Sequence, residues 1–134
     1  MSDGATILLI GPETRRAACE LVQQAPQGWM VRIGEPPRTL EQSSRFWATC
    51  RDVARSSATW DGERQTKQAW HDLFLSGWLI ATRRQRPPRL MLGLEGERIC
   101  LIPHSRDLSE REMSEVLDYI GAWCAGNGIP LKED

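Results

Sequence analysis

Apolar residues along the chain recur with two periods, and the first third of the sequence contains both. Short apolar runs at Thr6–Ile10 and Trp29–Ile33 are typical of strands, and the second has the alternation of a half-exposed strand. Between them, Glu13–Ala25 carries small and aliphatic residues at helical spacing until Pro26 ends the pattern. The chain is therefore predicted to open as β-α-β.

Two further helical patterns occupy the middle of the chain. A helix is predicted to begin at Thr39, because Thr39 and Gln42 have the T-x-x-Q spacing of a capping box. Its expected buried side consists of Leu40, Trp47, Cys50, Val53 and Ala54. After a turn predicted at Trp60-Asp61-Gly62, a second helical period runs from about Thr66 to Ala81. Trp60, Trp70 and Trp78 are expected in the core.

The last third of the chain predicts a hairpin followed by a helix. Leu90–Leu94 and Arg98–Ile102 flank Glu95-Gly96-Glu97, which is the pattern of two paired strands. Ser109 and Glu112 then form a capping box, and Leu108 and Met113 fit a hydrophobic staple. The apolar stripe of this final helix is Met113, Val116, Leu117, Ile120 and Trp123. The sequence thus predicts a single α+β domain over residues 1–134, with the order β-α-β-α-α-β-β-α.

Composition fits that interpretation. The 134 residues are 40% hydrophobic and 26% charged, and no apolar run approaches the length of a transmembrane helix. The first residues lack the basic and then apolar pattern of a secretory signal, so a cytoplasmic protein is expected. The four cysteines, Cys19, Cys50, Cys100 and Cys124, form no CxxC pair and are interpreted as buried small apolar residues.

The net charge of −1 conceals an uneven distribution. Residues 36–89 contain ten basic and five acidic residues, a net charge of +5, whereas residues 90–134 contain four basic and nine acidic residues, a net charge of −5. The basic segment is rich in arginine, which binds phosphate and stacks on bases. Four tryptophans lie within the same segment, and aromatic residues interleaved with arginines suit single-stranded nucleic acid.

Motifs of enzyme chemistry are missing from the sequence. It contains no P-loop, no GxGxxG, no HExxH and no GxSxG. His71 and His104 are interpreted as ordinary surface or hydrogen-bonded histidines. A metal-dependent nuclease using His104 and the acids Asp107, Glu110 and Glu112 is disfavoured, because the acids of the final helix do not converge on one point. No catalytic residue, no metal and no cofactor is predicted.

One segment adds a resemblance to this interpretation. Arg38-Thr39-Leu40-Glu41-Gln42-Ser43-Ser44-Arg45-Phe46-Trp47-Ala48 resembles the signature of the NinB family of phage recombination proteins, R-[ST]-L-[DE]-Q-N-x-[KR]-x-W-A, although Ser43 replaces the usual Asn. The predicted elements fall in the order expected for that family over nearly the whole chain. The resemblance implies a homodimer that binds DNA, preferentially single strands, and helps to load a strand-exchange recombinase past single-strand binding protein, without a cofactor.

The resemblance also selects candidate residues. Gln42 and Trp47 match the motif positions expected to matter for DNA binding, although each also has a structural interpretation, Gln42 as a cap and Trp47 as core. The full set of predicted nucleic-acid-binding residues is Arg38, Gln42, Arg45, Trp47, Arg51, Arg83, Arg84, Arg86 and Arg89. The alternative function is that of a phage accessory protein which binds a host protein through its acidic C-terminal surface.

Overall fold

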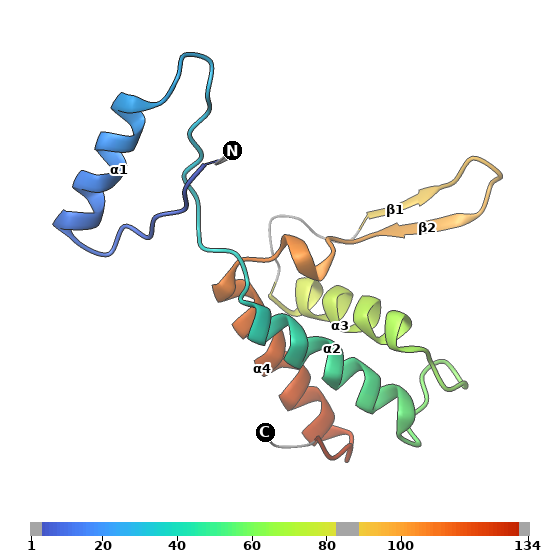
Figure 1. Ribbon diagram of the computed structural model, residues 1–134. Helices are drawn as coiled ribbons and strands as arrows, with labels where there is room; N and C mark the ends of the chain where they lie inside the picture. Colours follow the sequence, from blue (N-terminus) through green and yellow to red (C-terminus); the bar gives the residue numbers. More distant parts are fainter. Residues whose placement is uncertain (1–3, 83–88, 132–134) are drawn as a thin grey trace. The chain divides into compact units, whose positions relative to one another are not determined.

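The computed structural model describes residues 4–82 and 89–131 (Figure 1). The chain divides after Pro36 into two compact units, residues 1–36 and residues 37–134. We refer to them as the N-terminal unit and the helical unit. None of the helices in the described part of the chain is both long and apolar enough to cross a membrane.

The N-terminal unit contains helix α1 (Pro12–Gln24) between two extended segments. The predicted strands at Thr6–Ile10 and Trp29–Ile33 are wrong, because neither segment pairs in a sheet with any described residue. Their apolar side chains are open to solvent: Ile10, Met30 and Ile33 are each more than 80% exposed. A strand needs a partner for its backbone hydrogen bonds, and the described chain provides none for these segments.

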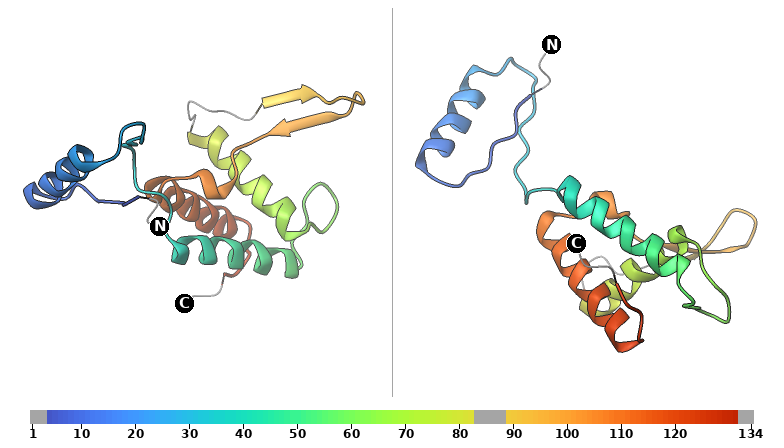
Figure 2. Two further views of the ribbon diagram at one scale, coloured as in Figure 1. Left: turned by 45° about the horizontal axis from the view of Figure 1, so that its top comes forward. Right: turned by 60° about the horizontal axis from the view of Figure 1, so that its bottom comes forward.

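The helical unit is built from α2 (Leu40–Arg55), α3 (Lys67–Thr82) and α4 (Glu110–Gly126), as Figures 1 and 2 show. Between α3 and α4 lie the antiparallel strands β1 (Arg89–Leu92) and β2 (Arg98–Leu101), followed by the short 3₁₀ helix η1 (Ser105–Asp107). The described order is α-α-α-β-β-α, so the predicted order is wrong in its two leading strands, and the one described sheet is this hairpin.

Local signals in the sequence account for where these helices begin. The hydroxyl oxygen of Thr39 accepts a hydrogen bond from the backbone N–H of Gln42, and Ser109 does the same for Glu112. Both predicted capping boxes are therefore confirmed. The Trp60-Asp61-Gly62 turn is also confirmed: Trp60 and Glu63 exchange backbone hydrogen bonds, while Asp61 and Gly62 adopt positive φ angles of 56° and 79°.

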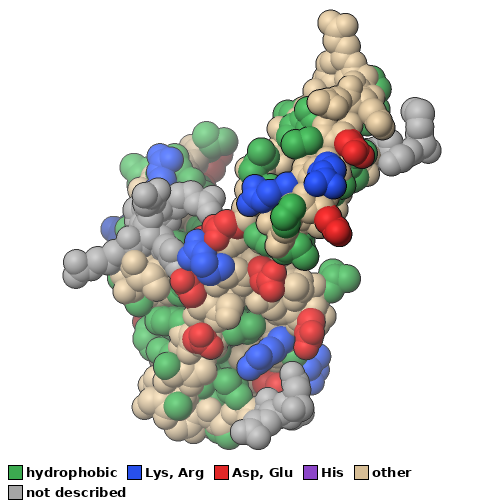
Figure 3. Space-filling model, turned by 90° about the vertical axis from the view of Figure 1, so that its left-hand side faces the viewer, with side chains coloured by type: hydrophobic (Ala, Val, Ile, Leu, Met, Phe, Trp, Pro, Cys, Tyr) green, Lys and Arg blue, Asp and Glu red, His purple; other side chains and the backbone are tan. Residues whose placement is uncertain are grey.

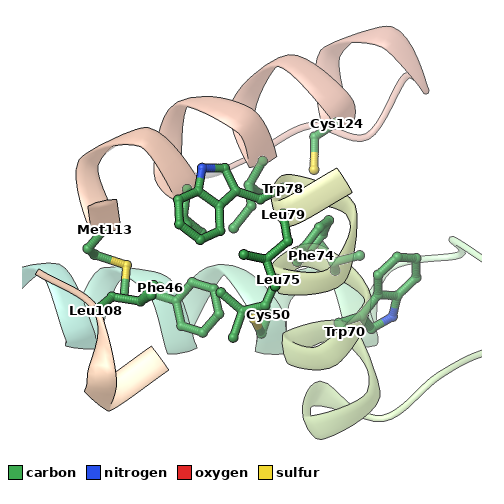
Figure 4. Close-up of a cluster of buried hydrophobic side chains, with 13 residues drawn as sticks. Phe46, Cys50, Trp70, Phe74, Leu75, Trp78, Leu79, Leu108, Met113 and Cys124 are labelled. Carbon is green, nitrogen blue, oxygen red and sulfur yellow. The ribbon is translucent and has the colours of Figure 1, made fainter. Parts of the chain in front are cut away.

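The core of the helical unit lies where the three helices meet (Figure 4). Trp70 and Trp78 of α3 and the staple residues Leu108 and Met113 are all buried, as predicted. On α2, however, the buried side is turned toward Phe46, which is fully buried, whereas Leu40 is 89% exposed. Other expected core residues are only partly covered, namely Trp47, Ala54, Leu117 and Trp123, and Trp60 is 46% exposed.

The cysteines divide into two pairs. Cys50 and Cys124 are buried, as predicted, and burial raises the pKa of the Cys50 thiol to about 12, so this thiol stays protonated at neutral pH. Cys19 on α1 and Cys100 on β2 are exposed, and for these two the prediction is wrong. Both lie on elements whose apolar faces remain open in the described chain.

Candidate nucleic-acid interface

The start of α2 is fastened to the segment around η1. The backbone N–H of Arg38 donates to the carbonyl oxygen of Leu108 at 3.1 Å, and the Arg38 guanidinium (Nη1) donates to the carbonyl oxygen of Arg106 at 3.3 Å. Gln42 uses both ends of its amide: Oε1 accepts from the Thr39 N–H at 3.0 Å, and Nε2 donates to the Glu110 carbonyl oxygen at 3.1 Å. Arg38 and Gln42 therefore connect two segments of the fold.

Trp47 is half-buried on the flank of α2 and has one face of its indole ring occupied. That face stacks on the ring of His71, with 4.8 Å between ring centres and 14° between ring planes. Phe46 meets the same indole edge-on at 5.7 Å. A ring held in this way can present only its remaining face or edge to a ligand.

The outer side of α2 carries the exposed arginines of the predicted site. Arg45 is exposed and makes no side-chain hydrogen bond or ion pair with any residue that the structure describes. Arg51 lies 3.7 Å from the carboxylate of Asp52, with 48% of its side chain exposed. Arg55, which the sequence prediction did not include, is also exposed. Its spacing of four residues from Arg51 is the feature of the sequence that could have identified it.

Of the remaining predicted arginines, only Arg89 is among the residues that the structure describes. Arg89 is exposed at the first position of β1, where it pairs with Leu101 of β2. Arg83, Arg84 and Arg86 lie outside the described residues. On the face of the molecule drawn in Figure 3, basic side chains are interspersed with acidic ones rather than gathered into a single stripe.

The acids of the C-terminal third are partly engaged within the fold. The Asp107 carboxylate accepts the backbone N–H of His104, and the Glu112 carboxylate accepts that of Ser109. Glu115 accepts a hydrogen bond from Arg111 at 3.4 Å. Among the described residues, no group of three His, Cys, Asp or Glu side chains is arranged to hold a metal ion. These contacts leave fewer acids for an external partner than the charge count predicts.

A polar cluster adjoins Trp47 and contains both histidines of the chain, of which His71 is buried and His104 is half-buried. His71 is 4% exposed; its Nδ1 lies 2.7 Å from the Asp72 carboxylate, and its Nε2 accepts the backbone N–H of Ser105 at 3.3 Å. His71 is thus a hydrogen-bonded histidine, as predicted. Burial, with the neighbouring His71 and Arg106, lowers the pKa of His104 from its ordinary value.

The order Asp72, His71, Ser105 has the composition of a hydrolytic triad but not its geometry. The lone pair of His71 Nε2 that would take the serine proton is used by the Ser105 backbone N–H. The Ser105 hydroxyl is fully buried and has no hydrogen-bond partner among the described residues. This cluster therefore supports the fold around η1 rather than nucleophilic chemistry.

An aromatic pocket between α3 and α4 was not anticipated from the sequence. Its volume is about 100 Å³, it is partly open to solvent, and it is lined by Trp60, Trp70, Leu73, Phe74, Gly77, Tyr119 and Trp123. Trp60 packs edge-on against Trp123 at 6.0 Å and leaves 46% of its surface exposed. Within the helical unit, Trp60 is the indole with the largest accessible face.

Comparisons with known proteins agree with the motif at Arg38–Ala48. The family model described as NinB protein matches residues 4–132. A solved structure titled "Structural Genomics, NinB" is similar with a TM-score of 0.55 and 22% sequence identity, over 96% of this chain and 89% of that chain. At that identity the likeness concerns the fold. No curated protein matches the chain.

Proposed function

Because the chain belongs to the NinB family of phage recombination-related proteins, we propose that it binds single-stranded DNA and assists the loading of a recombinase, without catalysing a reaction itself. In this proposal it acts in the cytoplasm, beside the host single-strand binding protein and the recombinase. The observation that carries the proposal is the set of exposed arginines on the outer side of α2, within the family motif and just after it.

The arginines Arg45, Arg51 and Arg55 supply the electrostatic part of the proposed interface. Guanidinium groups bind phosphate by paired hydrogen bonds, and a phosphodiester backbone offers phosphates at regular intervals. Of the three, only Arg51 forms an ion pair with a described residue, and that pair is partly exposed. A partner with closely spaced negative charges relieves the mutual repulsion along α2.

Trp60 supplies the proposed stacking contact. Bases of a single strand stack on exposed aromatic rings at about 1–3 kcal/mol per base. Trp47 is less suited to this role, because His71 occupies one of its faces. Gln42 and Arg38 then act by holding the start of α2 in place rather than by touching DNA.

A homodimer is part of the proposal and rests on the N-terminal unit. None of the described residues of this unit is buried, although it exposes a long series of apolar side chains: Leu8, Leu9, Ile10, Leu21, Val22, Trp29, Met30, Val31 and Ile33. Monomeric soluble proteins seldom expose so much apolar surface in one segment. In this proposal, a second copy of the chain packs against these apolar side chains in the dimer.

The experiment is a binding titration of a fluorescent oligonucleotide, single-stranded against duplex, across a salt series. We expect tighter binding to the single strand and a steep loss of affinity with salt, because each neutralised phosphate releases counterions. Binding that does not change between low and moderate salt, or that is absent at low salt, contradicts the proposal.

Arginine variants make the test specific to α2. Changing Arg45 and Arg51 together to alanine should lower the slope of log affinity against log salt by about 0.7 for each phosphate that the variant no longer neutralises. The matched control replaces two exposed arginines of α1, Arg15 and Arg16, and should leave the slope unchanged. Equal slopes for all three proteins would remove α2 from the interface.

A further inference from the structure

The two histidines accept hydrogen bonds from two consecutive backbone N–H groups of η1. His71 Nε2 accepts from Ser105, as described above, and His104 Nδ1 accepts from the N–H of Arg106 at 3.1 Å. An imidazole nitrogen accepts only when it carries no proton, so both bonds require neutral rings. The tautomers follow: His71 carries its proton on Nδ1, facing Asp72, and His104 carries its proton on Nε2.

We propose that His71 and His104 form a proton-sensitive clip, in which His104 caps η1 and His71 fastens η1 to α3 only while both rings are neutral. This inference does not depend on DNA binding. Protonation of either ring places an N–H opposite the backbone N–H that it had accepted, which removes that hydrogen bond and sets two donors against each other.

The release would extend to the start of α2. The carbonyl oxygen of Arg106 accepts from the Arg38 guanidinium, and the carbonyl oxygen of Leu108 accepts from the Arg38 backbone N–H. Loss of the bonds at Ser105 and Arg106 therefore loosens the segment on which Arg38 rests. The clip connects the protonation of one buried ring, His71, and one half-buried ring, His104, to the position of the family motif.

The charged groups around the rings determine the direction of the response. The acidic neighbour of His71 is Asp72 on the same helix, with its carboxylate 2.7 Å from Nδ1. Around His104 lie Arg106 and Asp107 of η1 and Arg38 before α2. From α2, the uncharged ring of Trp47 meets His104 and that of Phe46 meets His71. The two ring centres are 4.7 Å apart, so a charge on one ring opposes a charge on the other.

The lowered pKa of His104 fixes the sign of the pH dependence. The unfolded ring, with an ordinary pKa of about 6.5, binds its proton more readily than the folded ring. The contribution of His104 to stability is therefore fully present above about pH 6.5 and declines as the pH falls from there toward the folded pKa. Acid, not base, is expected to open the clip.

Amide hydrogen exchange of the full-length protein tests the clip directly. Between pH 7.5 and 5, after correction for intrinsic exchange, the opening constants of the Ser105 and Arg106 amides should rise by up to about tenfold per pH unit for each proton taken up. Amides in the middle of α4 should follow only global unfolding. Constants for Ser105 and Arg106 that stay flat with pH would overturn the proposal.

Matched variants separate the role of each ring as a hydrogen-bond acceptor from its ability to take up a proton. His71→Gln places an amide oxygen near the position of Nε2, and His104→Asn places one near Nδ1 at a helix-capping position that suits asparagine. The double variant should keep both amides protected at neutral pH and lose the acid response. An unchanged acid response in the double variant would overturn the proposal.

A measurement on the unmodified chain remains decisive if the double variant does not fold. Nitrogen–proton correlation spectra of the imidazole rings at pH 7.5 should find His71 Nδ1 protonated and His104 Nδ1 unprotonated. The opposite tautomer on either ring contradicts the clip.

Discussion

Gln42 shows how a residue of the motif can serve the fold and affect binding only through it. Both ends of its amide are engaged, one in the cap of α2 and one on the Glu110 carbonyl oxygen. We expect Gln42→Ala to lower the free energy of unfolding by about 1–2 kcal/mol, because the variant lacks both the cap and the hydrogen bond to α4. Urea denaturation measures this.

Ser44→Ala is the control for this prediction, because Ser44 is exposed two residues further along α2 and makes no cap. Its effect should remain within about 0.5 kcal/mol. If Gln42→Ala weakens oligonucleotide binding while stability is unchanged, then the side chain contacts DNA directly and the structural role assigned to it is wrong.

Side-chain burial could be predicted only in part. Caps such as Thr39–Gln42 depend on residues three positions apart, so spacing alone identifies them. The buried side of α2 depends on where α3 and α4 lie, and tertiary packing buries Phe46 while leaving Leu40 exposed. The stack of Trp47 on His71 joins residues from different helices, so no local sequence pattern predicts it.

At the scale of elements, the packing of α3 against α4 depends on a glycine. A side chain at Gly77 would run into the hydroxyl and ring of Tyr119, whereas Gly121 on α4 has open space around it. We expect Gly121→Ala to raise stability by up to about 1 kcal/mol through helix propensity. Gly77→Ala should instead cost about 1–3 kcal/mol through overpacking. Thermal denaturation compares the two.

Tyr119→Ala removes the obstacle and thereby isolates the cause. On that background, Gly77→Ala should no longer destabilise the protein, because only the gain in helix propensity remains. A penalty at Gly77 that persists without the Tyr119 ring would place the constraint elsewhere in α3.

Helices were easier to predict than strands for a physical reason. The hydrogen bonds of α2 or α4 close within the segment itself, so caps and periodicity suffice to locate them. A strand is completed only by a partner: the hairpin was found because β1 and β2 are neighbours in sequence. The composition of strands is also found at Thr6–Ile10 and Trp29–Ile33, but neither segment pairs with a sheet edge in the described chain.

At the scale of the whole molecule, the boundaries of the basic segment over residues 36–89 differ from the boundaries of the part of the chain that forms the core. Within the basic segment over residues 36–89, Lys67 and Asp72 of α3 cancel, and α2 contributes a net charge of +1. Most of the +5 charge comes from Arg83, Arg84, Arg86 and Arg89. Every residue that the structure describes as buried lies in the helical unit. The N-terminal unit therefore contributes apolar surface rather than core to the chain.

This distribution predicts that residues 37–134 fold without the N-terminal unit but do not dimerise. The shortened chain retains all thirteen buried hydrophobic residues and should unfold in one cooperative transition. Sedimentation should find it monomeric and the full chain dimeric. The melting temperature of the full chain should rise with protein concentration, because association stabilises the folded state by mass action, whereas that of the shortened chain should not. A shortened chain that remains dimeric would move the interface to the helical unit, with the exposed leucines of the hairpin as the next candidates.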